Sequence, residues 1–411
     1  MLLVLLCGAQ FLVVLDATIV AIALPDIRES LGFSEAGLQW VLSAYTLTFG
    51  GLLVVAGRAG DLVGRRRMFA AGVAAFGVAS LACGLAPSAG ALVAARAVQG
   101  AAAAALTPAA LAILTTAPID RGRAVGWWTA AAAGGGASGW VLGGVLVEAF
   151  GWTAVFLVNV PLCAAGAVLV PRLVPATAAA GAGRLDLAGA VAVTAGLSLL
   201  VLGLESGTIA ALLAAAVALV AFVAIERRAA DPILPPWTLR RPAFASASGA
   251  ALALTAATTP AMFLSVLYMQ EELGRSALEA GLACAPFNLA VIAGSLAAPR
   301  WRPRIAMPAG LVTVAAGAAA LIVALAPGFL LMGAGLGVAA VASTASGTAA
   351  LGEDDQGIAS GVLNAGAQIG TALGLAVVIA FATATSRTAG LVAAAGIALA
   401  AAAGVTRGRL A

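Results

Sequence analysis

A carboxyl group and a guanidinium group stand inside long apolar runs of the sequence, at Asp16 and Arg96. A carboxylate that is ionised and unpaired inside a membrane helix costs about 3 kcal/mol or more. The neutral form avoids most of this cost, so a carboxyl group at that depth can take up and release a proton. The chain has no histidine, which removes the usual imidazole carrier. Asp16 is therefore a candidate proton carrier, and the alternative is a structural acid paired with a neighbouring side chain.

The spacing of Asp16 and Arg96 places the two charges at the same depth. A helix rises 1.5 Å per residue, so Asp16 lies roughly 22 Å above the cytoplasmic start of its helix. Arg96 lies roughly 9 Å below the outer start of its own helix, in a hydrocarbon core about 30 Å thick. The two residues are expected to pair or to sense each other's charge, with Gln99 on the same helix face as Arg96. A proton-coupling site and a buried ion pair that locks the helices together are both compatible with this placement.

Composition restricts the chain to the membrane class. Hydrophobic residues make up 63% of the 411 residues, charged residues 9%, and the mean hydropathy is +1.09. Soluble domains carry about 25% charged residues, so this chain cannot cover itself with a hydrated surface, and a soluble enzyme is excluded. The 21 basic residues are all arginines between apolar runs, which indicates membrane anchoring rather than nucleic-acid binding. Four scattered cysteines favour small buried side chains over disulfides, and no metal site or cofactor is predicted.

Fourteen apolar stretches are long enough to cross a bilayer, for which a helix needs about 20 residues. The run from 187 to 225 divides in two at Glu205-Ser-Gly. The sequence thus predicts an all-α polytopic protein of the cell membrane, plasma or inner. The expected spans are 2–24, 38–57, 68–86, 90–114, 124–147, 150–170, 187–204, 208–225, 244–269, 279–298, 305–325, 329–350, 358–383 and 388–406.

Arginine positions predict the orientation of these spans. With a cytoplasmic N-terminus, 17 of the 21 arginines fall on the inner side. Three fall outside, at Arg28, Arg275 and Arg387, and Arg96 lies within a helix. Because arginine is enriched in cytoplasmic loops, this asymmetry predicts that both termini are cytoplasmic. Glutamates at the outer helix ends, Glu148 among them, are expected at a solvated rim.

A specific motif follows the second predicted span. Gly57, Asp61, Gly64, Arg65 and Arg66 have the spacing G-x-x-x-D-x-x-G-R-R. Glycine permits a tight turn, and the arginines anchor the segment at the cytoplasmic face. A generic positive-inside loop is the alternative to a cytoplasmic gating loop. In its full spacing the segment resembles the signature loop between helices 2 and 3 of the major facilitator superfamily.

Further motifs narrow the resemblance, and they occur in one order along the chain. They are Leu15-Asp16-Ala-Thr18 through Pro25, Gln39-Trp40 through Tyr45, Arg96-Ala-Val-Gln99-Gly100, Phe156-Leu-Val-Asn159-Val-Pro161 and Gln270-Glu-Glu-Leu-Gly274. Together they resemble the fourteen-helix drug:proton antiporter family. The resemblance implies the major facilitator fold, with two six-helix bundles plus two extra helices. It also implies export of hydrophobic drug- or antibiotic-like compounds in exchange for protons.

The fifth predicted span carries the family's antiporter motif with one departure. The helix 5 glycine motif comprises Gly135, Gly139, Trp140, Gly143 and Gly144, and Trp140 stands where the family pattern has proline. Glycines four residues apart make a smooth face for close helix packing. Plain packing and a coupling role are both compatible with this stripe. The substitution removes the proline that would kink the helix.

An internal repeat is expected to divide the chain. Two parallel repeats are a known transporter plan, which predicts an N-terminal six-helix bundle over 1–171, two inserted helices with their loops over 172–243 and a C-terminal six-helix bundle over 244–411. The repeat rests on four glycines that recur at a constant offset, and a chance match is the alternative because the chain has 50 glycines. Gly122, Gly126, Gly135 and Gly139 correspond to Gly357, Gly361, Gly370 and Gly374.

Polar residues within the spans are candidates for lining a substrate cavity, namely Gln99, Tyr45, Asn288, Asn364 and Gln368. The expected partners are the lipid bilayer, protons and a small hydrophobic or amphipathic substrate. No nucleic acid is expected, a monomer is expected to suffice, and the proton gradient supplies the energy in place of a bound cofactor. A symporter or uniporter that imports a small nutrient is the main alternative. A non-transporting sensor or scaffold is a third, and the two buried charges count against it.

Overall fold

The structure is a computed structural model that describes residues 1–176, 185–275 and 277–407. These residues form helices and no strand. In a bilayer interior a helix satisfies its backbone N–H and C=O groups internally, which is why long apolar runs fold this way. Thirteen described helices are long and apolar enough to cross a membrane, and the two parts of the bent helix α6 (Arg121–Phe150) make a fourteenth span when taken together. The prediction of an all-α polytopic chain is confirmed.

The chain divides into two compact units, neither of which is one continuous segment. The first unit comprises Met1–Thr116, Gly134–Pro235 and Glu353–Gly361. The second comprises Ala117–Ala133, Pro236–Gly352 and Val362–Ala411. Helices α6 and α17 (Gln356–Ala384) are therefore each shared, because their first turns belong to one unit and the remainder to the other.

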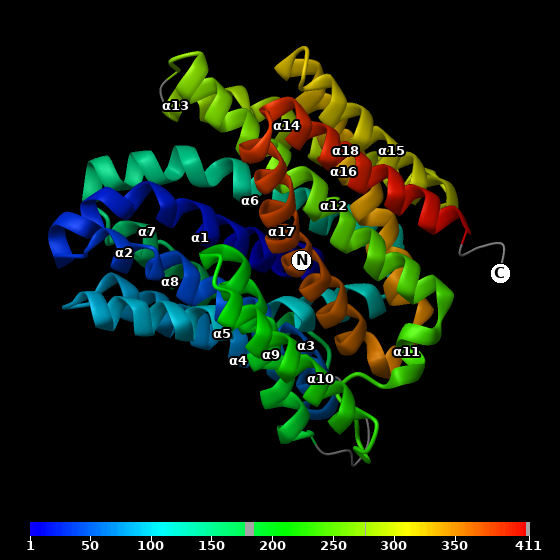
Figure 1. Cartoon of the computed structure of the whole chain (residues 1–411). Helices are drawn as coiled ribbons and strands as arrows, with labels where there is room; N and C mark the ends of the chain where they lie inside the picture. Colours follow the sequence, from blue (N-terminus) through cyan, green and yellow to red (C-terminus); the bar gives the residue numbers. More distant parts are fainter. Residues whose placement is uncertain (177–184, 276, 408–411) are drawn as a thin grey trace. The chain divides into compact units, whose positions relative to one another are not determined.

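The helices of the first unit run from blue to green in Figure 1. Besides the second part of α6 and the start of α17, they are α1 (Leu2–Leu31), α2 (Glu35–Leu38), α3 (Trp40–Val63), α4 (Arg65–Gly84), α5 (Ala89–Thr116), α7 (Ala154–Leu157), α8 (Asn159–Leu173), α9 (Leu187–Ser206), α10 (Ile209–Glu226) and η3 (Glu353–Asp355). Helix α5 packs against both α3 and α4, and α8 packs on α4.

The helices of the second unit run from light green to red in Figure 1. Besides the start of α6 and most of α17, they are α11 (Pro236–Arg240), α12 (Pro242–Leu267), η1 (Tyr268–Glu272), α13 (Ala277–Ala283), α14 (Ala285–Ala297), η2 (Ala298–Arg300), α15 (Pro303–Ala320), α16 (Leu325–Ala350) and α18 (Arg387–Arg407). The core of this unit is apolar and includes the fully buried side chains of Leu311, Phe329 and Leu391.

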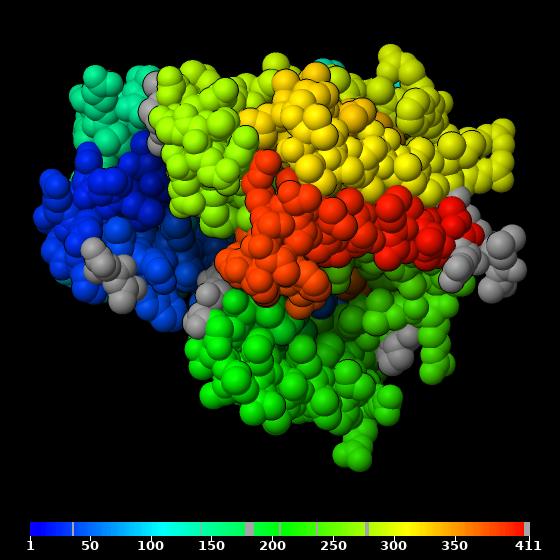
Figure 2. All heavy atoms as spheres, turned by 45° about the horizontal axis from the view of Figure 1, so that its top comes forward, coloured from blue at the N-terminus to red at the C-terminus, as the bar shows by residue number. Residues whose placement is uncertain are grey.

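Helices α9 and α10 form a hairpin, divided where the sequence predicts. Gly207 follows α9 with φ +65°, a left-handed conformation that glycine adopts without strain. The hairpin docks on α3, where the Ser198 hydroxyl donates to the Leu47 carbonyl oxygen at 3.3 Å. The outward side chains of α10 are apolar and well exposed, as at Val217 and Val220. Figure 2 shows this part of the chain in green. An apolar outer surface is expected of a helix that faces lipid.

The fifth helix of each predicted repeat packs on the first helix of the same repeat. A Cβ at Gly135 of α6 would lie 2.5 Å from the Phe11 carbonyl oxygen of α1. A Cβ at Gly370 of α17 would overlap the Leu252 carbonyl oxygen of α12. The corresponding glycines therefore serve the same purpose, which is to let two helix backbones approach closely.

Candidate functional site

Asp16 and Arg96 form an ion pair inside the first unit. An Nη1 hydrogen of Arg96 on α5 is donated to Asp16 Oδ2 on α1, with 2.7 Å between the nitrogen and the oxygen. The exposed fraction is 0% for Asp16 and 1% for Arg96. The charges that the sequence places at one depth are thus in direct contact and shielded from solvent.

Two amides complete the surroundings of the carboxylate. Gln99 Nε2 donates to Asp16 Oδ1 at 2.8 Å. Asn159 Nδ2, on the first residue of α8, donates to the same oxygen at 2.6 Å. A buried charge is tolerated only when a counter-charge and further hydrogen bonds offset its desolvation. Asp16 has one counter-charge and two neutral donors, contributed by α5 and α8.

The guanidinium of Arg96 is held from several sides. Its Nε donates to the Val41 carbonyl oxygen at 2.9 Å, and its Nη1 also donates to Gln99 Oε1 at 2.6 Å. The ring of Tyr45 lies 4.3 Å from the guanidinium carbon, within the range of a cation–π contact. The planar, always charged guanidinium can make all of these contacts at once, so Arg96 joins α1, α3 and α5.

The structure places Gln99 and Tyr45 in this buried network, with exposed fractions of 0% and 3%. The sequence suggests both as lining for a substrate cavity, which remains a prediction, and in this structure both residues contact Arg96. Gln99 Nε2 also donates to Ser80 Oγ at 2.8 Å. Residues three apart share a helix face, so the burial of Arg96 already implied that of Gln99.

Sequence reasoning did not single out Asn159 or Ser80 as site residues. Asn159 stands in the motif Phe156-Leu-Val-Asn159-Val-Pro161, where an amide in an otherwise apolar span was an available signal. Ser80 carries no comparable signal, because a serine hydroxyl can bond to its own helix.

The other cavity candidates lie in the second unit. Asn288 is on α14, and Asn364 and Gln368 are on α17, four residues apart and hence on one face of that helix. All three are partly buried. Their role in binding a substrate remains a prediction.

The predicted gating loop is a one-residue break between two helices. Helix α3 continues to Val63 and α4 begins at Arg65, so only Gly64 lies between them, with φ +104°. A non-glycine residue would be strained there. The predicted loop is therefore corrected in its extent, because Gly64 alone turns the chain and the other motif residues lie in α3 and α4. The gating role remains a prediction.

Asp61 binds the first turn of α17. Its two carboxylate oxygens accept the backbone N–H groups of Gly357 at 2.9 Å and Ile358 at 3.0 Å. Arg65 Nε donates to the same carboxylate at 3.0 Å. A carboxylate at a helix N-terminus is stabilised by the free N–H groups and the helix dipole. This set of contacts lies wholly within the first unit.

The remaining motif residues tighten the same region. Arg65 also donates to the backbone carbonyl of Glu353, and Arg66 Nη2 donates to the Pro171 carbonyl oxygen at 2.7 Å. A Cβ at Gly57 would overlap the Gly357 carbonyl group, so glycine is needed for the close approach of α3 and α17. The motif therefore joins α3 to α17 and α4 to the end of α8.

The glycine stripe of α6 packs on the helix that carries Asp16. A Cβ at Gly139 would overlap the Thr18 hydroxyl, and one at Gly143 would lie 3.2 Å from the Ile19 carbonyl oxygen. A Cβ at Gly144 would meet nothing within 4 Å. The two parts of α6 on either side of Trp140 are inclined by 43° although no proline is present, and the Trp140 side chain lies outside the described residues.

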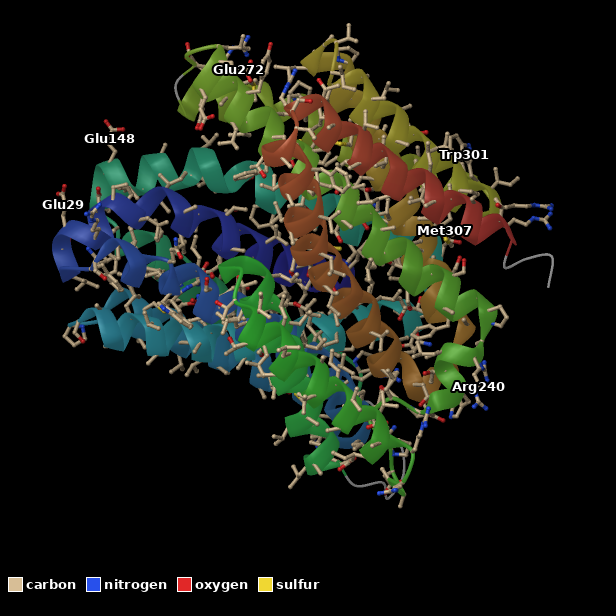
Figure 3. The ribbon with its side chains drawn as sticks, in the orientation of Figure 1. Glu29, Glu148, Arg240, Glu272, Trp301 and Met307 are labelled. Atoms are coloured by element: carbon tan, nitrogen blue, oxygen red, sulfur yellow. The ribbon has the colours of Figure 1, made fainter. Side chains whose placement is uncertain are left out.

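The rim acids are separate from the buried network. Glu29 and Glu148 point away from α1 and α6 in Figure 3, and both are exposed. Neither is a partner of Asp16 in the part of the chain that the structure describes.

Known proteins resemble the chain in sequence and in fold. Residues 6–225 match the model of the Major Facilitator Superfamily. A cephamycin export protein of Amycolatopsis lactamdurans is 41% identical, over 92% of this chain and 84% of that protein. A puromycin resistance protein of Streptomyces alboniger is 39% identical, over 91% of this chain and 80% of that protein.

Solved structures agree with this fold. The human organic anion transporter MFSD10 (TETRAN) has a TM-score of 0.72, with 98% of each chain covered and 17% identity. The E. coli fucose:proton symporter FucP has a TM-score of 0.69 at 15% identity, with 98% of this chain and 97% of that chain covered. The predicted major facilitator fold is confirmed. The chain belongs to the Major Facilitator Superfamily, within which it is related to the drug efflux transporters.

Proposed function

We propose that this protein exports small hydrophobic or amphipathic, antibiotic-like compounds across the cell membrane in exchange for protons, with both termini in the cytoplasm. The observation that carries the proposal is the fully buried Asp16 carboxylate and its contact with Arg96. The substrate class is supported by relatives named for cephamycin export and for puromycin resistance.

Protonation of Asp16 would change the contacts that join three helices. The ionised carboxylate attracts Arg96 and accepts bonds from α5 and α8. The neutral acid loses the charge–charge attraction and one acceptor position. Each protonation state therefore favours a different set of distances between α1 and its neighbours. A ligand, here a proton, shifts a conformational equilibrium only through such differential contacts.

The cycle then follows from mass action. A proton enters from the outside, binds Asp16 and favours one conformation, and it leaves to the cytoplasm as the substrate leaves outward. Arg96 can keep its bonds to Val41 and Gln99 when Asp16 is protonated. The guanidinium is then already in place when Asp16 is ionised again.

The test is substrate flux in proteoliposomes with and without an imposed pH gradient, using a panel of antibiotics. Asp16→Asn is nearly isosteric but cannot titrate. It should abolish proton-driven flux and retain exchange of substrate down its own gradient. Glu148→Gln, which removes an exposed carboxylate, is the matched control and should behave like the wild type.

Two outcomes would reject the proposal. Full proton coupling in Asp16→Asn would transfer the role to another acid. Uptake of a small nutrient in the transport direction opposite to export would instead favour a symporter or uniporter.

A further inference from the structure

The hydrogen bonds of Asp16 raise the question of where an added proton would go. In the ionised state the carboxylate only accepts hydrogen bonds, and all three of its partners are donors. A protonated carboxyl group must donate its O–H, so one neighbouring group must become an acceptor or the hydroxyl is left buried without a partner. An unmet buried donor is costly, so proton uptake requires a rearrangement here.

Two of the three partners cannot change from donor to acceptor. Arg96 has no acceptor atom. Gln99 has one acceptor atom, Oε1, but this oxygen already accepts from Arg96 Nη1 at 2.6 Å. Its Nε2 also donates to Ser80 Oγ. Turning this amide would break both bonds.

Asn159 differs from both. Its Nδ2 donates to Asp16 Oδ1, but its Oδ1 is buried and has no hydrogen-bond partner among the described residues. The residue is fully buried. A half-turn of the amide about χ2 exchanges its oxygen and nitrogen, and would present a free acceptor to the carboxyl group without breaking another bond.

We propose that Asn159 is the positioning residue for proton uptake, donating to the Asp16 carboxylate and, after a half-turn, accepting the O–H of the protonated acid. The proton, which comes from water, forms a bond with Oδ1, and the group changes from a charge of minus one to neutral. Gln99 can keep its bond to the same oxygen. This inference rests on the proposed function, because it presumes that Asp16 titrates.

Asn159 also lies where its span can bend. Helix α7 ends at Leu157, α8 begins at Asn159, and Val158 separates the two. Pro161 has no N–H, so the Leu157 carbonyl receives no bond from it. A change at the amide therefore acts at a break in the sixth span, which is a natural place for a kink.

Infrared difference spectra between high and low pH, recorded on the full-length protein in lipid, test this assignment. Asp16→Asn identifies the C=O band of the protonated Asp16 by removing it. Asn159→Leu should shift that band to higher wavenumber, because the O–H has lost its amide acceptor. Asn159→Thr, which keeps a hydroxyl, should shift it less. Cys163→Ala, one turn along α8 and also buried, is the packing control and should leave the band in place.

A second measurement needs no change at Asn159. The chain has three asparagines, at 159, 288 and 364, so asparagine with a heavy carbon isotope in the side-chain carbonyl gives three labelled groups. One labelled C=O band should move to lower wavenumber on acidification in the wild type, whereas none of the four labelled bands of Asp16→Asn, which adds an asparagine, should move. The inference would be overturned if the Asp16 C=O band stayed at the same wavenumber in both Asn159 variants. It would also be overturned if no labelled asparagine C=O band of the wild type changed with pH. Absence of any pH-dependent Asp16 band would instead reject the proposed function.

Discussion

The carboxylate of Asp61 at the end of α3 accepts the backbone N–H of Gly357, a residue 296 positions further along the chain, at 2.9 Å. This bond ties the end of the second span to the first turn of α17. The adjacent N–H of Ile358 and the Arg65 side chain contact the same carboxylate. Removal of Asp61 therefore affects one specific connection between distant parts of the sequence.

Asp61→Ala should lower substrate flux about tenfold. It leaves two buried N–H groups without their acceptor, at a cost of about 1–3 kcal/mol, and 1.4 kcal/mol corresponds to a factor of ten. Asp61→Asn keeps one acceptor oxygen and should lie between Ala and the wild type. Flux in proteoliposomes is the measurement, and the exposed Asp354→Asn is the control. Equal flux in Asp61→Ala and Asp354→Asn would show that the connection is unimportant for transport.

Gly139→Ala and Gly144→Ala make a matched pair on α6. A Cβ at Gly139 would overlap Thr18, and overpacking of this kind costs about 1–3 kcal/mol. A Cβ at Gly144 meets nothing within 4 Å, and alanine should stabilise the helix by up to about 1 kcal/mol. Thermal unfolding in detergent should therefore rank Gly144→Ala above the wild type and Gly139→Ala below it. The reverse order would contradict the packing of α6 on α1.

Arg96→Gln should lower proton-driven flux, because it removes the charged partner of the Asp16 carboxylate. Arg96→Gln should also destabilise the protein, because it leaves Asp16 without its counter-charge. The double variant with Asp16→Asn should recover part of the lost thermal stability. A double variant less stable than Arg96→Gln alone would contradict a direct pairing energy.

The predicted orientation can be checked by labelling. The variants Arg66→Cys and Glu272→Cys, made separately, should react with an impermeant thiol reagent from opposite sides of the membrane, because the arginine asymmetry predicts opposite sides for the two positions. Three of the four native cysteines are buried, and Cys7 is partly exposed, so a variant without Cys7 is the proper background. Labelling of both positions from one side would invalidate the predicted orientation.

Hydropathy located every span because a bilayer demands long apolar helices and little else. The depth of Asp16 and Arg96 was equally readable, since helix rise is constant. Which neighbouring helix each helix face contacts was harder to predict. Sequence spacing does not say which neighbour a helix face meets, so the contact between the Tyr45 ring and the Arg96 guanidinium was not predictable.

Contacts between distant helices were not predictable from one sequence. Nothing in the spacing of Asn159 indicates that its amide meets a carboxylate on α1. The partner of Asp61 was hidden for the same reason, since the first turn of α17 is recognised through backbone N–H groups that every residue but proline carries. Such contacts depend on how the helices pack, and helix packing results from many weak side-chain contacts acting together.

The hairpin of α9 and α10 is a segment by which this chain could have become longer or shorter. Because it contains an even number of spans, it returns the polypeptide to the side of the bilayer from which it departed. Its gain or loss would leave the sidedness of all later helices intact, whereas a single added helix would invert them. Where the hairpin docks, Gly51 of α3 lies against the small side chains of Thr194 and Ser198 of α9. The hairpin could therefore be gained or lost as a unit without changing the orientation of the spans that follow it.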